Sequence, residues 1–334
     1  MLRTLRPLPC AAVLLAVLST GCGVLGGSSP TATSTPTATL TRTPTHTMTP
    51  TSTPTLTPTS TPMPTPTWTP RPFVQSDGLV VAQGGVAVLR VIGAGDSASA
   101  TYKGRTIELL QAPAGFWGVI GAEATEEVGQ FSIAVTLRDA GGNVLEERRT
   151  TLSVSPTGYP VEYITLPPDQ SGLLGPDVGA QEEALRQQMF ATSSTEKLWS
   201  GPFTYPVPGA PINSPYGQLR SYNGGPISGF HHGADLGVAE GTAVYAAATG
   251  RVAFVAAMPI RGNSVVIDHG AGVFSGYHHL SSVAVAVGQY VSQGNLIAYS
   301  GASGLATGPH LHWEVIVHGL SVDPVPWTYE DIGP

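Results

Sequence analysis

The sequence has little cysteine and little charge. Its only two cysteines are Cys10 and Cys22, and charged residues make up 11% of the 334 positions. The chain beyond residue 22 therefore contains neither a disulfide nor a thiol nucleophile. A net charge of −7 gives no basic surface for nucleic acid. It also gives no long-range attraction to an anionic polymer, so such a substrate would have to be held by local contacts.

The N-terminus has the pattern of an export signal. Arg3 and Arg6 precede the apolar run "AAVLLAVL", and "STGC" follows it. The run is too short to cross a bilayer and is typical of a secretory signal. Its end resembles a bacterial lipobox, although Ser19 stands where leucine is usual. We expect residues 1–22 to be a lipoprotein signal peptide.

Lipidation of Cys22 would anchor the protein to the outer face of a membrane in the cell envelope. The alternative is ordinary cleavage, which would release the exported protein. Residues 23–72 are rich in threonine and proline, as in "TPTSTPMPTPTWTP". Such a composition cannot bury a core, so this segment is predicted to be a disordered stalk.

Residues 73–156 alternate apolar and polar positions between turn residues, and the chain as a whole contains 41 glycines and 30 prolines. In "QFSIAVTL", Phe131, Ile133, Val135 and Leu137 fall on one face, as a half-buried strand requires. "DAGGN" is a credible hairpin turn. The segment is predicted to be an immunoglobulin-like β-sandwich that acts as a spacer or binding module.

A linker is expected over residues 157–197, with a helix at 181–193. Glu182 and Arg186 are spaced for an i,i+4 ion pair on that helix. Apolar strand patterns resume near residue 198 and continue to about 330, so a second, mostly β domain is predicted there. The predicted fold class is therefore mostly β.

Histidine is concentrated in this second domain. Eight of the nine histidines follow Ser228, and three segments hold most of them: "FHHGADLG", "GYHHLS" and "GPHLHWEV". His310 and His312 are two apart on a predicted strand, so both should project from one face. His231 and Asp235 can supply a nitrogen and an oxygen from a tight loop.

Two histidines and one carboxylate suit a catalytic zinc ion with an open position for water, although nickel, iron or manganese would accept the same ligands. Taken alone, each segment is more often an ordinary polar feature of a strand or loop than a metal site. Three such segments within about eighty residues are harder to attribute to chance. His46, His269 and His318 lack a partner pattern, which favours structural or solvated roles.

Residues 205–324 resemble the lysostaphin-type zinc endopeptidases, the M23 (LytM-like) family. That family is marked by His-x-x-x-Asp, Tyr-x-His-Leu and Gly-x-His-x-His, and this chain has "HHGAD", "YHHL" and "GPHLH" in that order. "GTAVYAAATGRV", "GNSVVIDHG" and "VGQYVSQGNLIAYSG" support the match. The resemblance implies a two-sheet β scaffold with the metal at the floor of a groove.

Carried onto this chain, the resemblance implies that His231, Asp235 and His312 bind one Zn²⁺ ion. It also implies that His279 and His310 are catalytic histidines. His232 and His278 occupy variable positions of the motifs. Related envelope proteins that act as activators have usually lost such ligands, whereas this set is complete.

The function implied is a cell-envelope metalloendopeptidase that hydrolyses peptide cross-links of peptidoglycan with metal-activated water. The bond would lie either between glycines or between D-alanine and a diamino acid. Two alternatives are a non-enzymatic wall-binding or regulatory module that uses the same groove, and an extracellular protease acting on proteins.

Overall fold

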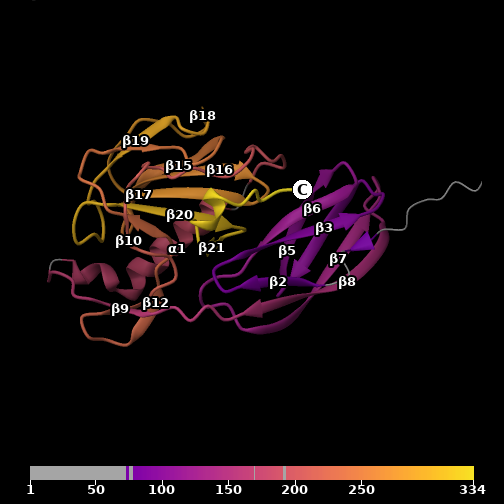
Figure 1. Cartoon of the computed structure of the whole chain (residues 1–334), viewed down its shortest axis with the longest axis horizontal. Coiled ribbons are helices and arrows are strands. Elements are labelled where there is room, and N and C mark those ends of the chain that lie inside the picture. The colour runs from indigo at the N-terminus through magenta and orange to yellow at the C-terminus, as the bar shows by residue number, and fades with distance from the viewer. Residues whose placement is uncertain (1–72, 75–77, 169, 191–192) are drawn as a thin grey trace, which may run out of the picture. The chain divides into compact units, whose positions relative to one another are not determined.

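Strands dominate the described chain, which in this computed structural model comprises residues 73–74, 78–168, 170–190 and 193–334 (Figure 1). The mostly β fold class is confirmed. The predicted signal peptide, Cys22, the stalk and His46 lie outside the described residues, so those assignments stay predictions. Within the described ranges, no helix combines the length and the apolar character needed to cross a bilayer.

The first part of the described chain is one eight-stranded sheet that folds over a common core. Its order is β1-β3-β6-β5-β4-β7-β8-β2. The strands are β1 (Phe73–Val74), β2 (Leu79–Ala82), β3 (Val86–Ile92), β4 (Ser97–Tyr102), β5 (Arg105–Ala112), β6 (Gly115–Gly121), β7 (Gly129–Arg138) and β8 (Val144–Ser155). The first half of β5 pairs with β4 and its second half with β6, so β5 joins the two layers.

The alternation expected for "QFSIAVTL" is confirmed in β7. Ile133, Val135 and Leu137 are fully buried, and Phe131 packs against the same core. The "DAGGN" turn closes on the Asp139 carboxylate, which accepts hydrogen bonds from the backbone N–H groups of Gly141 and Asn143. Apolar periodicity and turn chemistry together fix this hairpin.

The second part is built on a ten-stranded sheet whose main path is β10-β13-β20-β17-β16-β15-β18, with β14, β19 and β21 attached (Figure 1). The strands are β10 (Ile212–Ser214), β13 (Ala234–Leu236), β14 (Ala243–Tyr245), β15 (Gly250–Met258), β16 (Gly262–Gly270), β17 (Val273–Val283), β18 (Tyr290–Val291), β19 (Leu296–Ser300), β20 (Leu311–Val317) and β21 (Leu320–Val322). Every residue of β20 is buried, as expected for a central strand.

The segment expected to be a linker contributes a strand of its own. β9 (Val161–Ile164) pairs in parallel with β11 (Leu219–Tyr222), which pairs on its other side with β12 (Ile227–Phe230). This three-stranded sheet ends immediately before the first histidine motif. The 3₁₀ helix η1 (Ser171–Leu174) then leads into the only α-helix of the described ranges.

That helix, α1, covers Pro176–Phe190, so the predicted start at residue 181 was wrong. Residues 191–192, near the predicted end, lie outside the described residues. Pro176 occupies the first helical position, where its missing N–H costs nothing and its fixed φ favours the helical turn. Met189 is buried, and Leu185 and Phe190 pack beside it on side chains of the large sheet.

The expected i,i+4 pair between Glu182 and Arg186 was also wrong, because each side chain has other partners. Glu182 binds Arg261, and Arg186 binds Glu314. Both helix residues are buried. Sequence spacing identifies a possible surface pair, but here the helix face that carries the charges packs inward.

Strand β6 joins the core of the second part. Trp117 and Val119 pack in one cluster with Trp199, Phe203 and Trp327. The buried Tyr216 hydroxyl adds a polar link: it accepts a hydrogen bond from the Ala124 backbone N–H and donates one to the Ser321 carbonyl oxygen.

Tyr216→Phe is expected to lower the free energy of unfolding by about 1–3 kcal/mol, because it leaves a buried N–H and a buried carbonyl without a partner. Chemical denaturation of the full-length protein measures the loss. Tyr290→Phe is the matched control, since Tyr290 is 55% exposed. Equal stability of both variants would contradict the role given to the Tyr216 hydroxyl.

Candidate metal centre and its groove

Strand pairing places an acidic residue next to a histidine. β13 runs antiparallel to β20, and the register sets Asp235 opposite His312. Side chains directly opposite each other in a pair project to the same face, so carboxylate and imidazole meet. β17 lies on the other side of β20 and carries the second histidine motif.

His231 reaches the same point from the turn between β12 and β13. Gly233 permits this close turn, because a Cβ atom at that position would lie 2.2 Å from the Trp313 carbonyl oxygen. Gly233 in "HHGAD" therefore lets the loop lie in close contact with the backbone of β20. His231 and Asp235 then point toward His312 from one side.

The three side chains converge tightly. His231 Nε2 is 3.0 Å from Asp235 Oδ1 and 2.9 Å from His312 Nδ1. His312 Nδ1 is 2.7 Å from Asp235 Oδ1. His231 and His312 are almost fully buried, and the Asp235 side chain is 15% exposed.

The outer ring nitrogens fix the tautomer of each histidine. His231 Nδ1 is 2.9 Å from the Pro215 carbonyl oxygen, which can only accept, so this nitrogen carries the proton. His312 Nε2 is 2.9 Å from the Glu314 carboxylate and carries the proton for the same reason. When both imidazoles are neutral, the nitrogens that face Asp235 therefore carry lone pairs.

Charge at the cluster follows from burial and its partners. Burial is the main cause that lowers the pKa of His231 to about 4. Burial also lowers the pKa of His312, but the hydrogen bonds and charges of Asp235 and Glu314 outweigh it and raise that pKa overall. Burial acts to raise the pKa of Asp235, yet the two histidines hold it well below its usual value.

Three lone pairs meet at this point, and a positive charge between them would relieve their repulsion. A tetrahedral ion with bonds of about 2.0–2.1 Å needs ligand atoms about 3.4 Å apart. The observed spacings of 2.7–3.0 Å are about 0.4–0.7 Å shorter than this, so the three side chains would move slightly apart around an ion. The donor set, the burial and the outer hydrogen bonds all fit a divalent ion.

His279 stands beside the cluster in an unusual backbone conformation. Its φ is +59°, in the left-handed region, next to an irregularity in the register of β17. This twist turns His279 toward the groove, where its ring centroid is 5.9 Å from that of His312. Its Nδ1 donates to the Ser303 carbonyl oxygen, which leaves Nε2 free. Burial is the main cause that lowers its pKa to about 3.

His310 completes the group from just before β20. Its ring centroid is 4.7 Å from that of His279, and its Nε2 is 3.7 Å from Asp235 Oδ1. Its Nδ1 donates to the Gly308 carbonyl oxygen. The structure thus brings together all five residues that the sequence singled out for this site.

The other histidines of the domain have packing roles. His278 Nδ1 lies 2.9 Å from the Ser264 hydroxyl, and His232 stacks on Phe230 with centroids 4.2 Å apart. His269 is buried between the Thr249 carbonyl oxygen and the Ser275 hydroxyl.

Several charged residues around the cluster were missed at the sequence level, among them Glu314, Arg186 and Arg261. Glu314 follows His312 by two positions on the same strand, so the period of the strand could have identified it. The two arginines come from α1 and from the turn before β16. Their approach to Glu314 depends on tertiary packing.

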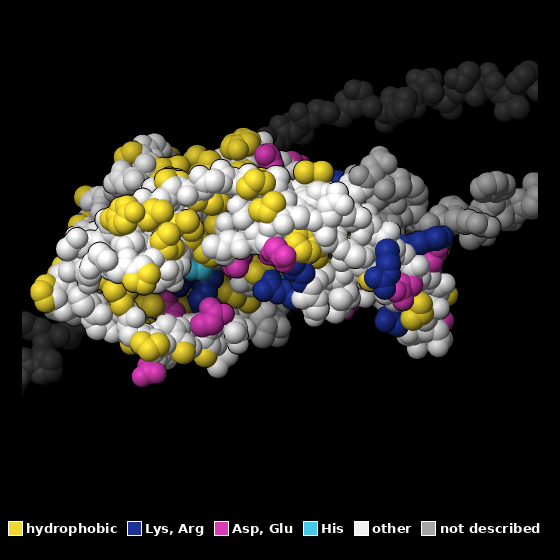
Figure 2. Space-filling view, turned by 90° about the horizontal axis from the view of Figure 1, so that it is seen from below, with side chains coloured by type: hydrophobic (Ala, Val, Ile, Leu, Met, Phe, Trp, Pro, Cys, Tyr) yellow, Lys and Arg dark blue, Asp and Glu magenta, His cyan; other side chains and the backbone are white. Residues whose placement is uncertain are grey.

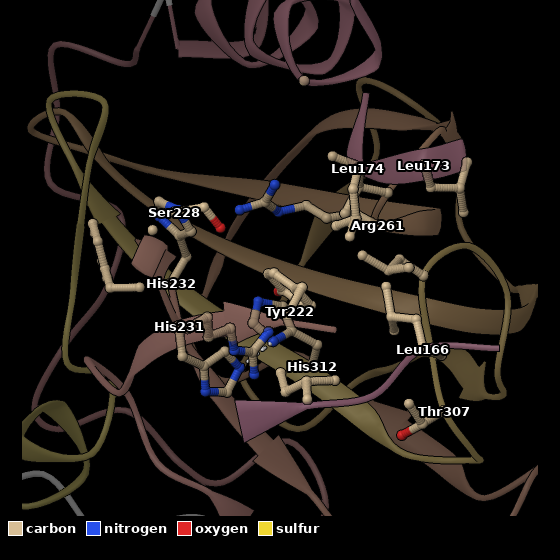
Figure 3. Close-up of a pocket in the computed structure, with 18 of the residues that line it drawn as sticks. Leu166, Leu173, Leu174, Tyr222, Ser228, His231, His232, Arg261, Thr307 and His312 are labelled. Carbon is tan, nitrogen blue, oxygen red and sulfur yellow. Dashed lines mark hydrogen bonds between the residues drawn. The ribbon is translucent and has the colours of Figure 1, made fainter. Parts of the chain in front are cut away.

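A groove of about 690 Å³ opens over the five residues. Figure 2 shows a histidine at the bottom of this hollow, with basic side chains inside and acidic ones near its rim. Leu166, Leu173 and Leu174 lie across the cavity from His231 and His312 (Figure 3). The linker thus forms one wall of the groove and the large sheet forms its floor.

Comparison with known proteins agrees with this geometry. Residues 229–324 match the model of peptidase family M23. They include all five histidine and aspartate residues of the site. The large sheet that positions those side chains therefore belongs to the domain that the histidine motifs indicated.

Two relatives from Vibrio cholerae serotype O1 each match part of the chain. The peptidoglycan DD-endopeptidase ShyA is 45% identical over 93 residues, which cover 28% of this chain and 22% of ShyA. The peptidoglycan DD-endopeptidase ShyB is 39% identical over 124 residues, which cover 36% of this chain and 28% of ShyB. The chain thus matches less than a third of the length of either relative.

A crystal structure from Pseudomonas aeruginosa, described as a peptidase M23, has a wider likeness. It aligns with a TM-score of 0.55 and 27% identity, and covers 75% of this chain and 96% of that one. The similarity therefore extends beyond the family-matched residues into the preceding part of the chain.

Divalent metal is expected to raise the thermal unfolding midpoint of the metal-free protein. An ion at about 100 times its dissociation constant would add about 2.7 kcal/mol of stability. Scanning fluorimetry with added Zn²⁺ measures the shift. Asp235→Asn should reduce it strongly, while His46→Ala should not. An equal shift in Asp235→Asn and wild type would argue against the assigned ligands.

Proposed function

Because residues 229–324 form a peptidase M23 domain, we propose that this protein is a zinc-dependent hydrolase of the peptide cross-links in peptidoglycan. The main support is the arrangement of five side chains at one groove. His231, Asp235 and His312 present three lone pairs to one point, and His279 and His310 stand beside it. Metal-assisted hydrolysis needs both kinds of group.

A bound Zn²⁺ ion would polarise the scissile carbonyl and activate a water molecule. His279 holds its Nδ1 proton on Ser303, so its free Nε2 can accept a hydrogen bond or a proton from that water. His310 has a side chain that is 17% exposed. It can exchange a proton with solvent and deliver it to the leaving amine or steady the oxyanion.

The named relatives favour one type of bond. ShyA and ShyB are peptidoglycan DD-endopeptidases. We therefore assign this chain to cross-links between D-alanine and a diamino acid, in preference to bonds between glycines. An open groove can receive an extended peptide strand, whereas an enclosed cavity could not.

The N-terminal sequence supports a location for this reaction in the cell envelope. A lipid on Cys22 would hold the protein at the outer face of a membrane, and the Thr/Pro-rich stalk would let the enzyme reach the wall.

His312→Ala is expected to abolish both zinc binding and cleavage, because it removes one of three metal ligands. His279→Ala and His310→Ala should retain zinc and lose about 10²–10⁴-fold in rate. Metal analysis and release of soluble fragments from purified sacculi measure the two effects. His46→Ala, in the stalk, is the matched control and should behave as wild type.

Wall binding without fragment release by the wild type, unchanged in His279→Ala and His310→Ala, would instead indicate a non-catalytic binding role for the groove. Mass spectrometry of the released muropeptides identifies the bond that is cut. Cleavage of casein without release of wall fragments would instead indicate a protease that acts on proteins.

A further inference from the structure

Four charged side chains, three of them buried, connect α1 to the metal centre. The Glu314 carboxylate accepts the Nε2 proton of His312 with one oxygen, at 2.9 Å. Its other oxygen accepts a hydrogen bond from Arg186 of α1, also at 2.9 Å. Arg261 Nε donates to the first oxygen at 2.7 Å. Glu314 is completely buried, so these partners replace its hydration.

Glu182, on the same face of α1, binds the segment that supports His279. It binds the Arg261 guanidinium at 2.6 Å and accepts hydrogen bonds from the backbone N–H groups of Ile260 and Arg261. The Arg261 carbonyl oxygen in turn accepts the backbone N–H of His279 at 2.9 Å. One helix therefore contacts the supports of both His312 and His279.

Charge balance indicates that the cluster works as a unit. Two arginines and two glutamates sum to zero, so no member is an unpaired ion in the interior. Without Arg186, the second oxygen of Glu314 would lose its buried cation. The Arg186 Nη2 contact to the Ser321 hydroxyl also sets the direction of the guanidinium. Figure 3 shows Arg261 at the same cavity as His231 and His312.

We propose that α1 is a positioning element of the metal centre: Arg186 fixes Glu314, and Glu314 fixes the tautomer and direction of the metal ligand His312. On this view, the functional unit of the hydrolase begins upstream of the family-matched residues 229–324. The inference rests on the proposed function only insofar as His312 binds a metal.

The test is the zinc affinity of full-length Arg186→Met, measured by competition with a chromophoric chelator. Loss of the support to a ligating histidine should weaken zinc binding about 10–100-fold. Arg251→Met is the matched control, because Arg251 is exposed on β15 and its guanidinium contacts the Gly288 carbonyl oxygen. Its zinc affinity should equal that of wild type.

A double-mutant cycle separates positioning from general destabilisation. If Arg186 acts through Glu314, Arg186→Met should add little to the loss caused by Glu314→Gln. Arg186→Lys, which keeps the charge, should recover part of the affinity and serves if Arg186→Met fails to fold. The proposal would be overturned by wild-type affinity in Arg186→Met or by fully additive losses in the cycle. If Arg186→Met does not fold, wild-type affinity in Arg186→Lys would overturn it.

The two hypotheses fail in different ways. A wild-type chain that binds no zinc would contradict the proposed function. Zinc binding by wild type together with an unaffected Arg186→Met would contradict only the role of α1.

Discussion

The structure depends on one electrostatic constraint: two neutral imidazoles and a carboxylate converge in a buried site with their lone pairs facing one another. As neutral rings, His231 and His312 cannot donate to Asp235, because their single protons are held by Pro215 and Glu314. Three lone pairs this close together are unfavourable unless a cation lies between them. The outer hydrogen bonds thus define where a metal belongs, and they come from a loop and from β20 itself.

Strands and a helix farther from the three ligands also hold the site in place. Pairing of β13 with β20 aligns Asp235 and His312, and the left-handed backbone of His279 turns a further imidazole to the same groove. The buried arginines and glutamates link these strands to α1. Stability and site geometry are therefore coupled, because the polar contacts that hold the helix also hold the ligands.

Much of this could be predicted from the sequence, because the motifs are local and strand periodicity is strict. "HHGAD", "YHHL" and "GPHLH" identified the five side chains, and the alternation in "QFSIAVTL" identified a half-buried strand. The predicted helix start was wrong because Pro176 already begins the helix. The Glu182–Arg186 pair was wrong because tertiary packing decides which helix face is buried. Glu314, Arg186 and Arg261 were missed because partners from separate segments meet only in the folded chain.

The parallel pairing of β9 with β11 has a mechanical consequence. When the chain on the N-terminal side is pulled away from the groove, the load runs along Val161–Ile164, roughly parallel to the neighbouring strand. The hydrogen bonds between the two strands are then loaded together in shear and do not open one after another. If Cys22 carries the proposed lipid anchor, tension on it would therefore leave this wall of the groove in place.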